Sequence, residues 1–225
     1  MKRLLRRIGR WLLGALLVLA ALAVCSVLLY RWINPPLTWL MVSEWRRLGQ
    51  IERQWVPLET MSAHVPRSAA AAEDANFCRH WGFDLDGIRA ALADSSRLRG
   101  GSTISQQTAK NVFLWPDRTW TRKGLEAGFT LLIETLWSKE RIMEVYLNVA
   151  EFDEGVFGVQ AAAQEYWGLD AAELGPLRSG RLMAVLPNPK DRSPVSGDPW
   201  VNARGARIQN GAATIRVDGR AACFS

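Results

Sequence analysis

Residues 11–30 read WLLGALLVLAALAVCSVLLY, a run of twenty residues that contains no charged side chain. As an α-helix, with a rise of ~1.5 Å per residue, this run spans ~30 Å, which is the thickness of the hydrocarbon core of one bilayer. We therefore expect a single transmembrane helix over residues 11–32. A cleaved signal peptide is the alternative, because Ala21 and Ala23 resemble a cleavage site, although the apolar region of a signal peptide is only ~7–15 residues long.

Positive charge is concentrated in front of this span, in residues 1–10, which hold no acid. Cationic residues beside a span favour the cytoplasm, so we predict a cytoplasmic tail over residues 1–10 and a folded part across the membrane. In that part we expect a membrane-proximal connector over residues 33–65 and a domain over residues 66–200. Residues 201–225 form a C-terminal segment to which the sequence assigns no role.

The formal net charge of +6 comes mostly from the tail, so the rest of the chain is nearly neutral. Without a basic domain or a recognition motif, nucleic acid is excluded as a partner. Three cysteines, at positions 25, 78 and 223, are too few for a disulfide framework, and a single bridge between Cys78 and Cys223 stays open. With only His64 and His80 besides, we expect no zinc site.

The hydrophobic pattern of the domain predicts a mainly α-helical fold. A helix over residues 69–80 is expected to start near Pro66 and Ser68 and to end at Gly82. The strand signal is weak throughout, and the last forty residues look least regular. Further helices are predicted over residues 84–97, 99–111, 119–137, 138–149, 156–167 and 172–186.

The segment EDANFCRHWGFD, residues 73–84, places two adjacent carboxylates on the first of these helices. Helical spacing would put Glu73, Phe77 and His80 on one face and Asp74 on the next. A carboxylate that is partly buried against apolar atoms has a raised pKa, as a general base working near neutrality needs. Taken alone, the spacing favours first-turn acids that stabilise the helix dipole, and a packing role for His80.

A second feature is an excess of cations between residues 97 and 123, where Asp117 is the single acid. The GGST turn, residues 100–103, starts a helix whose free amides favour anions, so the pattern suits a phosphate or pyrophosphate. The spacing is not that of a phosphate-binding P-loop, and for charge alone a solvated surface is the simpler explanation. The cations are Arg97, Arg99, Lys110, Arg118, Arg122 and Lys123.

The segment RKGLE, residues 122–126, places Glu126 four positions after Arg122 and three after Lys123 on an expected helix. Intrahelical ion pairs at this spacing contribute only ~0.2–0.5 kcal/mol each. The same arrangement would also hold an acid ionised among cations, next to a leaving-group site.

The segments EDANFCRHWGFD, GGSTISQQTAKN, RKGLEA and SKERIMEVYLN follow one another in this order behind the membrane span. Together they resemble the motifs of the peptidoglycan glycosyltransferases, most closely the monofunctional kind, which lacks a penicillin-binding domain. The resemblance covers roughly residues 36–195 and includes EFDEGVFGVQAAAQEYWG and LMAVLPNPKDRSP. The acids of EFDE are unexpected at that place, and residues 205–225 match no part of the family.

The resemblance implies a lysozyme-like, mainly helical glycosyltransferase domain on the periplasmic side of the bacterial cytoplasmic membrane. Such enzymes polymerise lipid II, a disaccharide-peptide on undecaprenyl pyrophosphate, into β-1,4 glycan strands with inversion and with release of undecaprenyl pyrophosphate. The implied partners are lipid II, the growing lipid-linked glycan chain, membrane lipids and other cell wall synthesis proteins. No tightly bound cofactor is implied, and a divalent cation, Mg²⁺ or Mn²⁺, at the pyrophosphate is left open.

The resemblance also assigns site residues. Glu73 is the base toward the acceptor 4-hydroxyl, and Glu126 acts on the donor side, because an inverting transfer needs both a base and stabilisation of the departing anion. The other expected substrate-binding residues are Asp74, Phe77 and His80 of the first motif, Ser102, Thr103, Gln106, Gln107 and Lys110 of the second, and the cations Arg118, Arg122 and Lys123. Structural roles are expected for Lys139, Glu144, Tyr146 and Asn148.

Two other functions compete with this one. A lysozyme-like lytic glycosidase would also use a glutamate on a helix, but it has no need for a pyrophosphate site. A non-catalytic membrane scaffold would keep the motifs for packing alone.

Overall fold

The computed structural model describes residues 2–85, 89, 101–117 and 119–224, and the chain divides into two compact units, Met1–Asn34 and Pro35–Ser225. The first unit contains one helix, α1 (Lys2–Tyr30), whose stretch Arg6–Tyr30 is long and apolar enough to cross a membrane. Most of its large apolar side chains are exposed. The helix is consistent with the predicted single-pass anchor.

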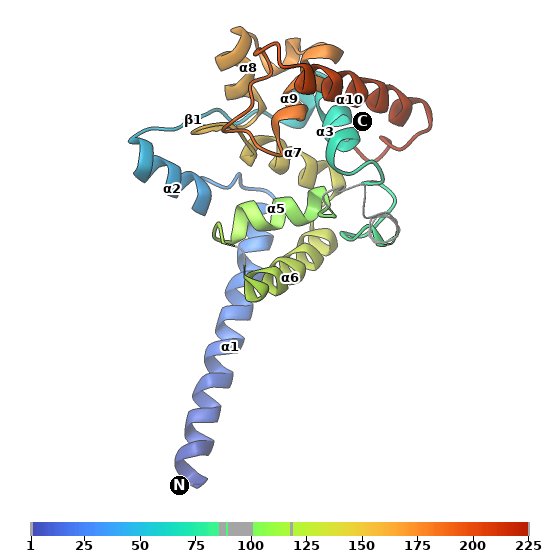
Figure 1. The fold of residues 1–225 in the computed structure, drawn as a ribbon. Helices are drawn as coiled ribbons and strands as arrows, with labels where there is room; N and C mark the ends of the chain where they lie inside the picture. The colour runs from blue at the N-terminus through green and yellow to red at the C-terminus, as the bar shows by residue number, and fades with distance from the viewer. Residues whose placement is uncertain (1, 86–88, 90–100, 118, 225) are drawn as a thin grey trace. The chain divides into compact units, whose positions relative to one another are not determined.

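The second unit is mainly helical, as the sequence predicts. In Figure 1, α3, α9 and α10 lie together, and α5 lies beside α6 and α7, which agrees with their packing contacts. The helices are α2 (Trp39–Leu48), α3 (His64–Glu73), α5 (Ile104–Phe113), α6 (Trp120–Leu136), α7 (Lys139–Val149), α8 (Val159–Trp167), α9 (Pro176–Val185) and α10 (Pro199–Val217), with short 3₁₀ turns η1 (Leu58–Thr60) and η2 (Ala171–Glu173).

Helix α7 runs through the core, and all of its residues from 142 to 149 except Glu144 are buried. The side chain of Asn148 bonds both backbone groups of Val56, at 2.9 Å each, and Glu144 accepts a hydrogen bond from the amide of Leu58 at 3.1 Å. These bonds fasten the segment before α3 to the core. Residues 35–65 and 201–225 therefore belong to the same compact unit as residues 66–200.

A small sheet joins this segment to the chain after α7. Its strands are β1 (Glu52–Arg53), β2 (Glu151–Asp153) and β3 (Val156–Phe157). Strand β3 is central, parallel to β1 and antiparallel to β2. The acidic EFDE stretch is therefore strand β2 and its turn, and strands this short explain the weak strand signal of the sequence.

The predicted bounds of the helix over residues 69–80 are wrong at both ends. Helix α3 begins before Pro66 and ends at Glu73, and Asp74, with φ −158° and ψ 74°, has left the helical conformation. The Asp74 carboxylate instead accepts hydrogen bonds from His80, at 2.8 Å, and from the amide of Ile104, at 3.0 Å. Because Ile104 is thirty positions away, no local pattern could reveal this end.

This end changes the geometry of the first motif. Glu73 is the last residue of α3, not a first-turn acid, so the explanation by the helix dipole is wrong. Glu73, Phe77 and His80 do not share a helical face, because residues 75–80 are turns.

The expectation of an irregular C-terminal region is also wrong, because α10 is a long helix that packs on α9 and α3. Its contact with α9 is made by two glycines: a Cβ at Gly180 would lie 2.5 Å from the carbonyl oxygen of Gly205. The backbones of α9 and α10 approach closely at these glycines. Helix α10 therefore lacks the broad apolar stripe by which a packed helix is normally recognised in a sequence.

The helices predicted over residues 99–111, 119–137 and 138–149 are confirmed as α5, α6 and α7, with Thr103, Thr119 and Ser138 as N-caps. The helices predicted over residues 156–167 and 172–186 correspond to α8 and α9. Both begin later than predicted, because the first predicted residues form strand β3 and the 3₁₀ turn η2 instead. The helix predicted over residues 84–97 lies mostly outside the described residues.

The cysteine bridge that the sequence left open is formed between Cys78 and Cys223, 145 positions apart. Their separation in sequence gives no sign of their proximity, which follows from the packing of α10 on α3. Cys25, in α1, is free. The bridge closes a long loop and so reduces the conformational entropy of the unfolded chain.

We expect the double substitution Cys78→Ser and Cys223→Ser to lower the free energy of unfolding by about 2–5 kcal/mol, because the long loop is then open in the unfolded state. Thermal and urea denaturation of the detergent-solubilised protein measure this change. Cys25→Ser, which breaks no bridge, is the matched control, and equal stability of all three proteins would contradict the expectation.

Candidate active site

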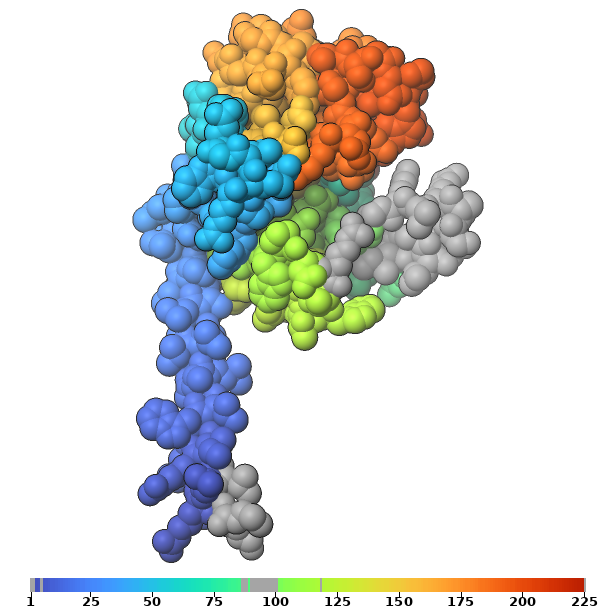
Figure 2. Space-filling model, turned by 60° about the vertical axis from the view of Figure 1, so that its left-hand side comes forward, coloured from blue at the N-terminus to red at the C-terminus, as the bar shows by residue number. Residues whose placement is uncertain are grey.

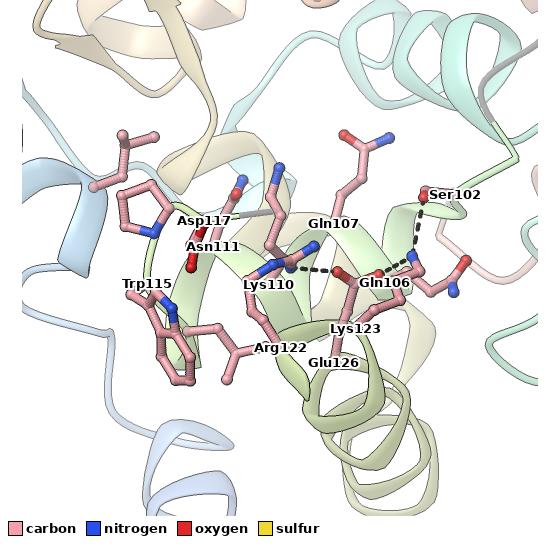
Figure 3. A pocket seen from close by; sticks show the side chains of 13 residues that line it. Ser102, Gln106, Gln107, Lys110, Asn111, Trp115, Asp117, Arg122, Lys123 and Glu126 are labelled. Atoms are coloured by element: carbon pink, nitrogen blue, oxygen red, sulfur yellow. Dashed lines mark hydrogen bonds and ion pairs between the residues drawn. The ribbon is translucent and has the colours of Figure 1, made fainter. Parts of the chain in front are cut away.

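A cavity of about 480 Å³ lies between α5, α6 and the segment that joins them. Figure 3 shows its side chains, and in Figure 2 the blue surface of α2 adjoins the green surface of this region. The wall combines apolar and cationic side chains. It is lined by Leu40, Ser102, Gln106, Gln107, Lys110, Asn111, Leu114, Trp115, Pro116, Asp117, Arg122, Lys123 and Glu126.

Glu126 is the buried carboxylate of this cavity, with 2% exposure. Its Oε2 accepts a hydrogen bond from Arg122 at 2.6 Å, and its Oε1 pairs with Lys123. Lys123 in turn lies 3.4 Å from the hydroxyl of Ser102, so the first turn of α6 is connected to the start of α5. A carboxylate held by two cations fixes their positions while each keeps other N–H donors for a ligand.

Arg122 has one donor to spare. Its Nε is buried and has no hydrogen-bond partner among the described residues. This donor is therefore available to a ligand with acceptor oxygens.

Hydrogen bonds at its N-terminus hold helix α5 in place at the cavity. Thr103 caps it in a capping box: its hydroxyl accepts from the amide of Gln106, at 3.2 Å, and Gln106 Oε1 accepts from the amide of Thr103, at 3.0 Å. The Thr103 hydroxyl also donates to the carbonyl of Gly82 at 2.7 Å. Thr103 is therefore buried behind the cavity, whereas Gln106 reaches its wall.

Glu73 lies behind the same cavity and is connected to it through Gln107. The amide of Gln107, which lines the cavity, donates to Glu73 Oε2 at 3.0 Å. The other oxygen, Oε1, is buried without a hydrogen-bond partner among the described residues and lies 3.7 Å from a guanidinium nitrogen of Arg204. One oxygen is thus oriented by an amide, and the other has its lone pairs available for a donor.

Tyr146 holds Gln107 from the far side. Its hydroxyl lies 3.5 Å from Gln107 Oε1 and can donate to it. Burial, and then the nearby charges of Glu73 and Asp74, raise the pKa of Tyr146 well above its ordinary value. The phenol therefore stays neutral and keeps the proton that orients Gln107.

Phe77, a residue of the first motif, lies in a cluster of side chains from several elements. Phe77 is fully buried, with the ammonium of Lys139 4.4 Å from its ring centroid. Lys139 also pairs with Glu134 at 2.7 Å, and Glu134 accepts a hydrogen bond from the buried Ser105. The cluster connects the loop after α3 with α5, α6 and α7.

The structure brings seven expected site residues to one cavity and leaves five outside its wall. Glu73, Asp74, Phe77, His80 and Thr103 lie behind it, and Arg118 is outside the described residues, as are Arg97 and Arg99. Those on the wall are Ser102, Gln106, Gln107, Lys110, Arg122, Lys123 and Glu126.

Sequence reasoning missed several residues here. Arg204, on α10, pairs with Glu73 at 3.7 Å, and the sequence did not suggest it because the C-terminal region looked irregular. Burial lowers the pKa of Arg204, and the charge of Glu73 counteracts this shift. Asn111, Trp115 and Asp117 also line the cavity. Asn111 is the last residue of the second motif, and Trp115 and Asp117 follow it within six positions, which was the signal that could have found them.

Comparison with known proteins shows the family to which the chain belongs. The family model described as Transglycosylase matches residues 41–213. A biosynthetic peptidoglycan transglycosylase of Jannaschia sp. (strain CCS1) is 51% identical over 96% of this chain and 90% of its own length. Enzymes with the same description from Rhodospirillum centenum and Caulobacter vibrioides are 50% and 48% identical, over 99% and 100% of this chain and 96% and 100% of their own lengths. The chain belongs to the transglycosylase family.

We expect Asp74→Ala to destabilise the domain by about 1–3 kcal/mol, because it leaves the buried amide of Ile104 without an acceptor. Asp74→Asn, which keeps one acceptor oxygen, should cost less. Urea denaturation followed by circular dichroism measures both, and equal losses for Ala and Asn would show that the bond to Ile104 is not the reason.

Proposed function

We propose that the cavity binds the pyrophosphate of the lipid-linked donor and that Glu73 deprotonates the acceptor hydroxyl. As a member of its family, the chain is a biosynthetic peptidoglycan transglycosylase, an enzyme that polymerises glycan strands for cell wall synthesis. One observation carries the proposal: Gln107 lines the cationic cavity and also donates to Glu73, so an anion site and a base stand on either side of one side chain.

On the acceptor side, Glu73 takes the proton from the 4-hydroxyl of an incoming lipid II while that oxygen attacks C1 of the donor sugar. Glu73 Oε1 suits this role, because it lacks a hydrogen-bond partner among the described residues whereas Oε2 is held by Gln107. A guanidinium nitrogen of Arg204 lies 3.7 Å from Oε1 and places a positive charge beside it.

On the donor side, the bond between C1 and the pyrophosphate oxygen breaks and undecaprenyl pyrophosphate leaves. Lys110, Arg122 and Lys123 supply positive charge to the departing anion, and Glu126 keeps Arg122 and Lys123 in place. Attack from the side opposite the leaving group inverts the sugar centre, which matches a base and an anion site on two sides of the reacting carbon.

A divalent cation, Mg²⁺ or Mn²⁺, would neutralise part of the pyrophosphate charge in the bound complex. Among the described residues, no group of three or more His, Cys, Asp or Glu side chains could hold a metal ion. Glu126 and Asp117 are the two carboxylates of the cavity wall. This donor set fits an ion that arrives with the substrate better than a resident cofactor.

We place the domain on the periplasmic side of the cytoplasmic membrane, with residues 1–10 in the cytoplasm. The cations before the span support this orientation, and so does the bridge between Cys78 and Cys223, since disulfides persist in oxidising compartments. Lipid II, the growing glycan and membrane lipids would then meet the domain at the membrane surface, where other cell wall synthesis proteins also work.

We expect Glu73→Gln to lower polymerisation by about a thousand-fold, because the amide cannot accept the hydroxyl proton. Glu126→Gln should lower it by about a hundred-fold, because Arg122 and Lys123 lose the charge that orders them. Labelled lipid II in detergent with Mg²⁺, followed by electrophoresis of the glycan and lysozyme digestion, measures both.

Glu140→Gln, an exposed acid at the start of α7, is the matched control and should polymerise normally. Unchanged polymerisation in Glu73→Gln would remove the base assignment. Cleavage of preformed glycan without polymerisation would favour the lytic glycosidase instead.

The orientation predicts where a membrane-impermeant maleimide reacts. In a Cys25→Ser background, Glu140→Cys should be labelled in intact spheroplasts, whereas Arg3→Cys should react only after permeabilisation. The opposite pattern would reverse the orientation.

A further inference from the structure

The last described residues, Asp218–Phe224, follow α10 and lie against the loop Asp74–Trp81, which carries the first motif. We call these two segments the C-terminal strap and the motif loop. The proposed catalytic chemistry uses no residue of the strap, and the match to the family model ends before it, at residue 213. Its contacts with the motif loop are made by Arg220, Cys223 and Phe224.

A covalent bond and a hydrogen bond join the strap to the motif loop. The disulfide connects Cys78 in the loop with Cys223 in the strap. A guanidinium nitrogen of Arg220 lies 3.4 Å from the carbonyl oxygen of Ala75, two residues after Glu73. Arg220 is itself oriented by Asp218, with which it pairs at 2.7 Å.

An aromatic contact adds to these bonds. The ring of Phe224 lies 6.0 Å from the ring of Phe77, centroid to centroid, and Phe224 is 4% exposed. The Phe77 ring also contacts His80, edge-on at 6.4 Å, and Lys139, above its face. The strap thus supplies one wall of the pocket in which Phe77 is buried.

The motif loop needs such support, because it has little regular structure of its own. Helix α3 ends at Glu73. Inside the loop, the amide of Phe77 donates to the carbonyl of Asp74, and the amide of Arg79 donates to the carbonyl of Asn76. A segment with so few backbone hydrogen bonds takes its position from its side-chain contacts.

Displacement of Phe77 would be transmitted to Glu73 over a short path. The amide of Phe77 is bonded to Asp74, at 3.1 Å, and the Asp74 carboxylate binds both His80 and the amide of Ile104. Asp74 is the residue at which α3 ends, so its movement re-aims the carboxylate of Glu73 relative to Gln107.

We propose that the C-terminal strap is a positioning element for the glycosyl transfer, in which Phe224 and the disulfide hold the motif loop so that Glu73 reaches the acceptor hydroxyl. The proposal rests on the proposed role of Glu73 as the base. Phe224 is a positioning residue, because it acts through Phe77 and does not contact the reacting atoms. A misplacement of ~1 Å at a reacting group can reduce the rate by ~10²-fold, so a small shift of the loop has a large effect.

Kinetics of the full-length protein with lipid II separate positioning from folding. Phe224→Ala should lower kcat by about ten-fold or more while KM for lipid II changes less than about two-fold, because the cavity of α5 and α6 is untouched. Phe224→Leu, which refills the pocket of Phe77, should recover most of kcat. The double variant Cys78→Ser and Cys223→Ser should lower kcat in the same manner, and it answers the question if Phe224→Ala is unfolded at the assay temperature.

Thermal unfolding of each variant shows that kcat refers to folded protein, and Val217→Ala, at an 80% exposed position just before the strap, is the matched control. A strap that only stabilises the fold would lower the melting temperature and leave kcat of the folded enzyme unchanged, and that result overturns the proposal. Wild-type kcat in Phe224→Ala beside an inactive Glu73→Gln would reject the strap and leave the proposed function intact.

Discussion

The buried carboxylate of Asp74 is the interaction on which the site depends. It ends α3 directly after Glu73, binds His80 of the motif loop and caps the amide of Ile104 at the start of α5. One side chain therefore fixes both the helix that carries the proposed base and a helix that lines the cavity. A charged acceptor with two donors is among the stronger contacts available in a protein interior, and breaking it leaves buried groups unpaired.

Two separate networks of polar side chains complete the site. On one side, Gln107 orients Glu73 and is itself held by Tyr146. On the other, Glu126 orders Arg122 and Lys123 around the cavity. The first system leaves one carboxylate oxygen ready to accept a proton, and the second leaves cationic donors ready for an anion. The proposed inverting transfer from a pyrophosphate donor requires both a base and a site for the departing anion.

The C-terminal part of the chain closes this arrangement from outside. Helix α10 brings Arg204 to Glu73, and the strap that follows it is bonded to the motif loop through Cys223 and Phe224. The position of α10 depends on the close contact of Gly180 and Gly205. The contact between these two glycines therefore helps to place α10, and with it the positive charge of Arg204 beside the proposed base.

The sequence by itself determined the apolar N-terminal helix, the class of fold, helices α5 to α7 with their caps, and the pairing of Glu126 with its two cations. Each of these depends on residues at most a few positions apart, whose periodicity and side-chain chemistry act locally. Only the tertiary structure decided where α3 ends, which cation meets Glu73, that Cys78 pairs with Cys223, and that the last residues contact the first motif. These features join residues 30 to 147 positions apart, and such contacts form only when the packed core holds both partners in place.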